Sequence, residues 1–119
     1  MTEQTRNARL ARIYVERSSG QDLAAILPML DADAEYRSTR VGNHRGREAI
    51  GAMMGGFFAG FPDVAWQVAQ YEVVGTDTIE SDFVMRATDA ASGETIERPG
   101  RERIVFTDAG LIAVIEVVA

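Results

Sequence analysis

The chain has 119 residues, of which 46% are hydrophobic and 25% charged, a composition typical of one globular domain with its own core. The formal net charge of −6 disfavours a nucleic-acid-binding protein, and no apolar run approaches the roughly 20 residues of a membrane span. Without cysteine there is no disulfide, thiol nucleophile or thiolate metal site. We therefore expect a single domain over residues 1–119 that acts in the cytoplasm, with neither nucleic acid nor membrane as a partner.

The first part of the chain predicts two helices followed by a strand. Residues 3–17 carry an apolar helical face that includes Tyr14. A second, short helix begins near Gln21 and has to end or kink at Pro28, because proline lacks an amide donor and clashes with the preceding turn. Residues 34–39 then alternate between polar and apolar side chains, which predicts a strand.

A third helix, amphipathic and starting at Gly46, is the clearest element of the chain. Residues 40–45 form the loop that leads into it. A wide stripe of its apolar residues recurs at helical spacing and must face a core. The stripe consists of Ile50, Met53, Met54, Phe57, Phe58 and Phe61.

From Val64 onward the hydrophobic period changes to two, which predicts strands. The connections between them are short and rich in turn residues, so we expect an antiparallel meander. Its strands are expected at residues 64–74, 78–90, 95–107 and 111–118. The order of elements indicates an α+β fold, in which three N-terminal helices pack on one face of a curved sheet.

This order and several local motifs resemble the nuclear-transport-factor-2-like superfamily, and within it the SnoaL-like polyketide cyclases and ketosteroid isomerases. The motifs cover nearly the whole chain: Tyr14-Val15, Gly20-Gln21-Asp22-Leu23, Asp33-Ala34-Glu35-Tyr36, Gly46-Arg47-Glu48-Ala49-Ile50, Phe61-Pro62-Asp63-Val64 and Phe106-Thr107-Asp108-Ala109-Gly110-Leu111-Ile112. The resemblance implies a cystatin-like cone whose strongly curved, mostly antiparallel sheet encloses an apolar pocket. It implies no cofactor, and as partner a small lipophilic molecule that is steroid- or polyketide-like.

The isomerase branch of the family implies two catalytic residues and leaves a third role vacant. Its oxyanion-binding tyrosine matches Tyr14, and its second oxyanion donor, a protonated aspartate, matches Glu102. Its catalytic base matches Ser38, which cannot take up the proton. Three functions stay open: acid–base chemistry of the isomerase or cyclase type through Tyr14 and Glu102, a non-catalytic module that binds a ligand or dimerises, or purely structural pairing with another protein.

Strand alternation singles out Glu102 independently of the family. Its side chain falls on the same face as Ile104 and Phe106, in an apolar wall where burial raises the pKa of a carboxyl. Such a group can donate a hydrogen bond or act as a general acid or base. The alternative is a carboxylate at the rim of the pocket, or one neutralised by an arginine such as Arg98.

The register of the last two strands follows from the connection between them. A tight turn over residues 107–110 pairs Phe106 with Leu111. This register predicts two further cross-strand pairs: Glu102 with Ile115, and Arg101 with Glu116.

The apolar pattern of helix and strands also predicts the walls of the pocket. Besides Tyr14 and Glu102, we expect it to be lined by Tyr36, Ser38, Met53, Met54, Phe57, Phe58, Phe61, Trp66, Phe83, Met85, Ile104, Ile115 and Val117, with no metal site.

His44 is the only histidine, and two interpretations of it remain open. It is either a loop residue that bonds to local backbone, or a proton carrier at the mouth of the cavity, because histidine titrates near neutrality.

The outer face of the last strands is more apolar than solvent exposure requires. We therefore expect a homodimer through this outer sheet face. The outward positions are expected to include Val84, Val105, Ile112, Val114 and Val118.

Overall fold

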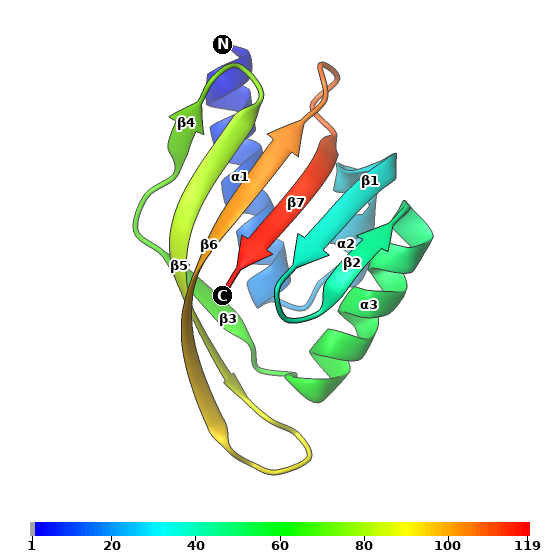
Figure 1. The fold of residues 1–119 in the computed structure, drawn as a ribbon, viewed down its shortest axis with the longest axis vertical. Helices are drawn as coiled ribbons and strands as arrows, with labels where there is room; N and C mark the ends of the chain where they lie inside the picture. The colour runs from blue at the N-terminus through cyan, green and yellow to red at the C-terminus, as the bar shows by residue number, and fades with distance from the viewer. Residues whose placement is uncertain (1) are drawn as a thin grey trace.

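The computed structural model describes residues 2–119 and, within them, three α-helices packed on one face of a curved seven-stranded sheet (Figure 1). This arrangement confirms the predicted α+β fold class. In chain order the elements are α1 (Glu3–Ser19), α2 (Leu23–Ile26), the 3₁₀ turn η1 (Leu27–Met29), β1 (Leu30–Ser38), β2 (Gly42–Arg45), α3 (Arg47–Gly60), β3 (Ala65–Val68), β4 (Glu72–Val74), β5 (Thr78–Thr88), β6 (Thr95–Phe106) and β7 (Ile112–Val118).

The sheet is mixed, with strand order β2-β1-β7-β6-β5-β3 and with β4 also paired to β5. Only the β1–β7 pair is parallel among the strand pairs of residues 2–119. The antiparallel part, in which β3 and β4 pair with β5, β5 with β6 and β6 with β7, is the meander that the sequence predicted. None of the helices in residues 2–119 is long and apolar enough to cross a membrane.

Local side chains and one glycine set the helix starts. The Thr2 hydroxyl accepts a hydrogen bond from the Thr5 amide at 3.1 Å, and the Asp22 carboxylate accepts one from the Ala25 amide at 3.3 Å. Both are N-cap bonds that satisfy amides without a helical partner. Gly46 precedes α3 with a φ of +90°, a backbone conformation that favours glycine.

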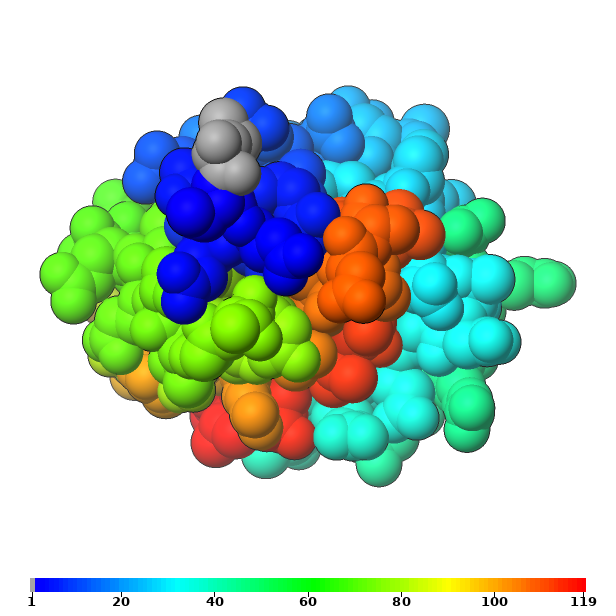
Figure 2. All heavy atoms as spheres, turned by 90° about the horizontal axis from the view of Figure 1, so that it is seen from above, coloured from blue at the N-terminus to red at the C-terminus, as the bar shows by residue number. Residues whose placement is uncertain are grey.

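The start of α1 closes one end of the cone. The Arg6 guanidinium donates to the carbonyls of Asp108, at 2.9 Å, and Thr107, at 3.3 Å, while the Gln4 amide donates to the Gly75 carbonyl at 2.9 Å. Figure 2 shows this part of α1 lying against the turns before β5 and before β7. The hydrogen bonds tie the helix to two turns far away in the sequence.

Three segments differ from the sequence prediction. The strand expected over residues 34–39 is β1, which begins four residues earlier, at Leu30. Residues 40–45, expected as a loop, contain the short edge strand β2, which pairs with β1. The strand expected over residues 64–74 is broken: β3 and β4 both pair with β5 but are separated by residues 69–71. Tyr71, in this break, packs against the core. The two-residue alternation of the sequence does not reveal this break.

The predicted register of the last two strands was wrong for two reasons. At the turn, Phe106 pairs with Ile112 and not with Leu111, so Ile112 faces inward and is fully buried, contrary to its predicted outward position. Beyond it, Val105 pairs with Val114, which leaves Ala113 as the extra residue of a bulge in β7. The other expected pairs shift as well: Glu102 lies opposite Val117, Arg101 opposite Val118, and Glu116 opposite Arg103.

Candidate active-site cavity

A cavity lies between the concave face of the sheet and helices α1 and α3. The centres of water molecules can occupy a volume of about 70 Å³ inside it. This is enough space for several waters. Most of its walls are apolar or aromatic. The lining residues are Tyr14, Val15, Ser18, Tyr36, Ser38, Arg40, Val41, Met53, Met54, Phe57, Phe58, Trp66, Val68, Phe83, Met85, Arg98, Glu102, Val117 and Ala119.

Most of the residues predicted for the pocket lie on these walls, and three do not. Ile104 and Ile115 face each other across β6 and β7 and are buried in the core, at 2% and 0% exposure. Phe61 lies just beyond α3, where its ring packs against that of Phe57 with a centroid distance of 5.1 Å. These three side chains support the walls from behind.

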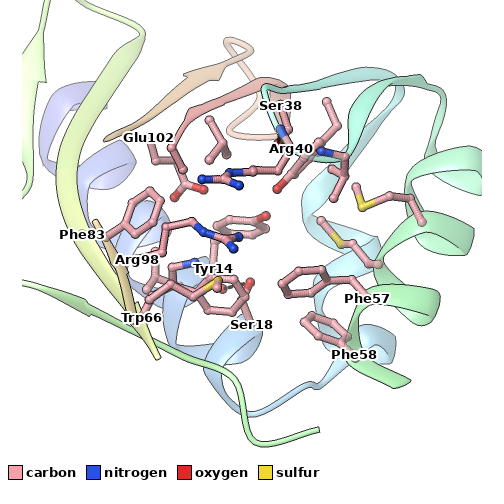
Figure 3. A pocket seen from close by; sticks show the side chains of 18 of the residues that line it. Tyr14, Ser18, Ser38, Arg40, Phe57, Phe58, Trp66, Phe83, Arg98 and Glu102 are labelled. Carbon is pink, nitrogen blue, oxygen red and sulfur yellow. Dashed lines mark hydrogen bonds between the residues drawn. The ribbon is translucent and has the colours of Figure 1, made fainter. Parts of the chain in front are cut away.

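Glu102 projects from β6 into the cavity (Figure 3). Its neighbours across the sheet are Ser81 on β5 and Val117 on β7. The side chain keeps partial access to solvent through the cavity, and its carboxyl forms no hydrogen bond or ion pair with another residue in the range 2–119. Burial raises the pKa of this carboxyl from 4.5 to about 7. Near neutral pH, Glu102 is therefore present in both protonation states.

Three tyrosines surround the carboxyl, and its negative charge contributes to raising the pKa of each: Tyr14, Tyr36 and Tyr71. For Tyr14 the main cause of the raised pKa is burial, followed by Tyr36 and then Glu102. Burial is also the main cause for Tyr36 and for Tyr71, whose pKa rises to about 12. The phenols thus stay protonated at neutral pH and are hydrogen-bond donors.

Tyr14 lies on the inner face of α1 and is only 4% exposed. One turn later on the same face, the Ser18 hydroxyl donates a hydrogen bond to the Tyr14 carbonyl at 2.9 Å. Tyr14, Tyr36 and Glu102 together form a polar group on an otherwise apolar wall. Such a group can exchange a proton with a bound molecule and stabilise an oxyanion.

Ser38 stands at the position of the family's catalytic base, but the hydrogen bonds of its side chain are structural. Its hydroxyl oxygen accepts hydrogen bonds from the amides of Arg40, at 3.1 Å, and Val41, at 3.3 Å. These bonds shape the turn between β1 and β2. Ser38 lines the cavity, but its oxygen serves this turn.

His44 lies on β2, outside the cavity lining, opposite Tyr36 on β1. Its Nε2 atom is 2.9 Å from the Val41 carbonyl oxygen and forms a hydrogen bond with it. The contact favours the interpretation of His44 as a loop residue that bonds to local backbone.

Aromatic rings form the wall that faces the polar group. The rings of Phe57 and Trp66 stack at 6.1 Å with an interplanar angle of 28°, and Phe58 meets Phe57 edge-on at 6.1 Å. Such a wall suits a flat, hydrophobic molecule.

Four further polar residues lie at or near the cavity. The prediction from the sequence gave each of them either no role in the site or a different role. Ser18 follows Tyr14 by four residues, so helical spacing could have identified it. Arg98 shares the face of Glu102 by alternation, but was considered only as a counter-ion, and no ion pair joins the two within residues 2–119. Arg40 lies in a turn and Tyr71 in a strand break. Neither position belongs to a hydrophobic period that could have identified the residue from the sequence.

In residues 2–119, no group of three His, Asp, Glu or Cys side chains is placed to hold a metal ion.

Comparison with known proteins places the fold in a large structural group. SalBIII, an epoxide hydrolase/cyclase-like enzyme of pyran ring formation in salinomycin, has a TM-score of 0.88 at 13% identity, covering 99% of this chain and 93% of SalBIII. RV0760c of Mycobacterium tuberculosis, solved with estradiol-17β-hemisuccinate, has a TM-score of 0.81 at 18% identity, with 93% and 92% covered.

A protein of Catenulispora acidiphila with a ketosteroid isomerase-like fold, solved with trimethylamine, has a TM-score of 0.78 at 17% identity, covering 87% of this chain and 79% of that one. No functionally curated protein matches the chain significantly. The family model of the SnoaL-like domain matches residues 11–115. The chain therefore belongs to the SnoaL-like domains of the nuclear-transport-factor-2-like superfamily.

Proposed function

We propose that the protein binds a small hydrophobic molecule inside its cone, and that Glu102 exchanges a proton with this molecule in a reaction of the isomerase or cyclase type. The observation that carries the proposal is an unpaired carboxyl with a pKa of about 7 in an apolar cavity. A general acid or base works best when its pKa lies near the pH at which it acts.

The surrounding phenols complete the proposed chemistry. When Glu102 is ionised it removes a proton from the ligand, and the developing oxyanion accepts a hydrogen bond from the Tyr14 phenol. The neutral Glu102 carboxyl then returns the proton to another atom of the ligand, so that no proton is gained or lost overall. Tyr36, on β1 and separated from the strand of Glu102 by β7, offers a second phenol to the same oxyanion.

The structural relatives support a hydrophobic ligand. RV0760c was solved with a steroid hemisuccinate, and SalBIII is described as cyclase-like. At 18% and 13% identity these proteins share the fold, so the ligand class is carried to this chain as part of the proposal.

One observation favours a second function, a non-catalytic binding module. The position of the family's base is Ser38, and the Ser38 oxygen is occupied by two amides of the turn. In that case Glu102 anchors a ligand by a hydrogen bond and transfers no proton.

Binding and turnover separate these functions. Estradiol-17β-hemisuccinate is titrated into ¹⁵N-labelled protein, and we expect shifts at the amides of cavity residues on α1, α3 and β6. Conversion of a β,γ-unsaturated ketosteroid to its conjugated isomer is followed by ultraviolet absorbance. Turnover that is lost in Glu102→Gln supports the catalytic proposal, whereas binding without turnover selects the binding module. The absence of binding would refute both.

We also propose a homodimer through the outer sheet face. Val105 and Val114 lie side by side on this face, and Val118 is 58% exposed. Charged residues lie on this face as well: Arg103 pairs across the strands with Glu116 between these valines, and the ion pair Arg37–Glu35, at 2.7 Å, lies to one side on β1. Sedimentation velocity at micromolar protein checks the proposal, and a monomer at all concentrations would contradict it.

A further inference from the structure

Two sets of arginines in this chain differ in their surroundings. Several arginines on the outer face of the sheet form ion pairs, as in Arg86–Glu97 at 2.8 Å and Arg101–Asp82 at 2.9 Å. Arg40 and Arg98 line the cavity instead (Figure 3). Among residues 2–119, no carboxylate lies within ion-pair distance of either cavity arginine.

Arg40 is presented to the cavity by a turn that is fixed on several sides. The Ser38 hydroxyl accepts a hydrogen bond from the Arg40 amide, and His44 bonds to the carbonyl of Val41. On the other side, the Thr39 amide donates to the Val117 carbonyl at 3.1 Å. The backbone that carries Arg40 is therefore preorganised, which reduces the entropy lost when its side chain binds a ligand.

Arg98 reaches the same cavity from β6, opposite Met85 of β5. The preceding residue, Glu97, points to the other face and pairs with Arg86, which holds this part of the hairpin in register. Arg98 is partly exposed and Arg40 is exposed, so both guanidinium groups lie where the cavity meets solvent.

A purely apolar ligand would fit these two groups poorly. Filling the cavity displaces water from the guanidinium groups, and a charge that loses water without gaining a partner is destabilised. Glu102 does not supply that partner, because the raised pKa of its carboxyl reflects burial and no arginine is among its causes. A negatively charged group on the ligand would restore both the charge balance and the hydrogen bonds.

We propose that the molecule bound in this cavity is a hydrophobic carboxylate, whose charged end is bound by Arg40 and Arg98 at the mouth while its apolar body lies against the aromatic wall. This inference rests on the proposed function, because it names the ligand class of the same cavity. It also assigns Ser38 and His44 a common role as positioning residues for Arg40.

The test uses two probes that differ only in charge, β-naphthoate and β-naphthamide, titrated by calorimetry at about pH 6, where a carboxylic acid is ionised. We expect the unmodified protein to bind the naphthoate at least about tenfold more tightly, the effect of charge-assisted hydrogen bonds. In the double variant Arg40→Met, Arg98→Met this preference should fall below about twofold, with the affinity for naphthamide unchanged.

Matched controls separate this role from general effects. Arg103→Met removes the same charge from β6 on the outer face and should leave the preference intact, and Arg98→Lys, which keeps the charge, should retain most of it. Equal affinity of the unmodified protein for both probes, or a preference that survives in the double variant, would overturn the inference. Binding of naphthamide without preference would overturn it while leaving the proposed function standing; binding of neither probe would overturn both.

Discussion

The ring of Phe83 occupies the space that a Cβ atom on Gly100 would need. A Cβ built there would lie 2.9 Å from Cε1 of Phe83 and 2.9 Å from the Val118 carbonyl oxygen. Gly100 falls between Arg98 and Glu102 on the concave face of β6, so its missing side chain lets an aromatic ring enter the cavity wall between two polar groups.

We expect Gly100→Ala to lower the free energy of unfolding by about 1–3 kcal/mol, because the added methyl group overpacks against backbone as well as a ring. Gly56→Ala is the control: nothing lies within 4 Å of that position on α3, and the change should stabilise the helix by up to about 1 kcal/mol. Urea unfolding measures both. Equal stability of the two variants would contradict the close packing at Gly100.

The raised pKa of Glu102 predicts how stability depends on pH. The folded protein binds the proton more tightly than the unfolded chain, so this contribution is full below pH 4.5 and is lost as the pH rises to about 7. We expect Glu102→Gln to remove this loss. The variant should therefore gain about 1–3 kcal/mol relative to the unmodified protein between about pH 5 and about pH 8.

Urea unfolding of both proteins across this range provides the measurement. A stability difference that does not change with pH would show that Glu102 has an ordinary pKa, and it would remove the main support for proton transfer by this residue.

Tyr14→Phe tests the proposed oxyanion contact. If the phenol stabilises charge only in the transition state, kcat should fall by about 100-fold with little change in KM. Tyr71→Phe is the control, because Tyr71 also lies near Glu102 but does not line the cavity. Steady-state kinetics with the ketosteroid compare the two. A fall of the same size in both variants would indicate a general effect on Glu102.

Ser38→Ala tests whether this residue positions Arg40. Loss of the hydrogen bonds to the turn should weaken the binding of β-naphthoate by about threefold and leave β-naphthamide unaffected. Ser92→Ala removes a similar bond, from the Glu94 amide at 3.2 Å, in a turn remote from Arg40 and should have no effect. Unchanged naphthoate binding together with lost turnover would assign Ser38 to the chemistry instead.

The sequence predicted those parts of the fold whose pattern is local. Helix α3 and strands β5 and β6 are long and strongly periodic, and they lie close to where the pattern placed them. The face of Glu102 follows from alternation along β6 alone, so it was right even though its partner on β7 was not.

Features that depend on distant contacts could not be predicted in this way. The break before β4 contains Tyr71, which packs against the core, and the position of Arg40 depends on hydrogen bonds to β7 and β2. Neither contact leaves a period or a turn motif in the neighbouring sequence. The place of Arg40 at the mouth of the cavity became visible only once the turn between β1 and β2 had been located.

The bulge at Ala113 also separates the turn before β7 from the pocket. It allows Ile112 and Ile115, three residues apart, to point into the same core. Deletion of Ala113 would remove only the residue without a cross-strand partner, so Val114 would still pair with Val105 and Val117 with Glu102. The chain can therefore lose one residue at this point while the side chains that line the pocket keep their faces.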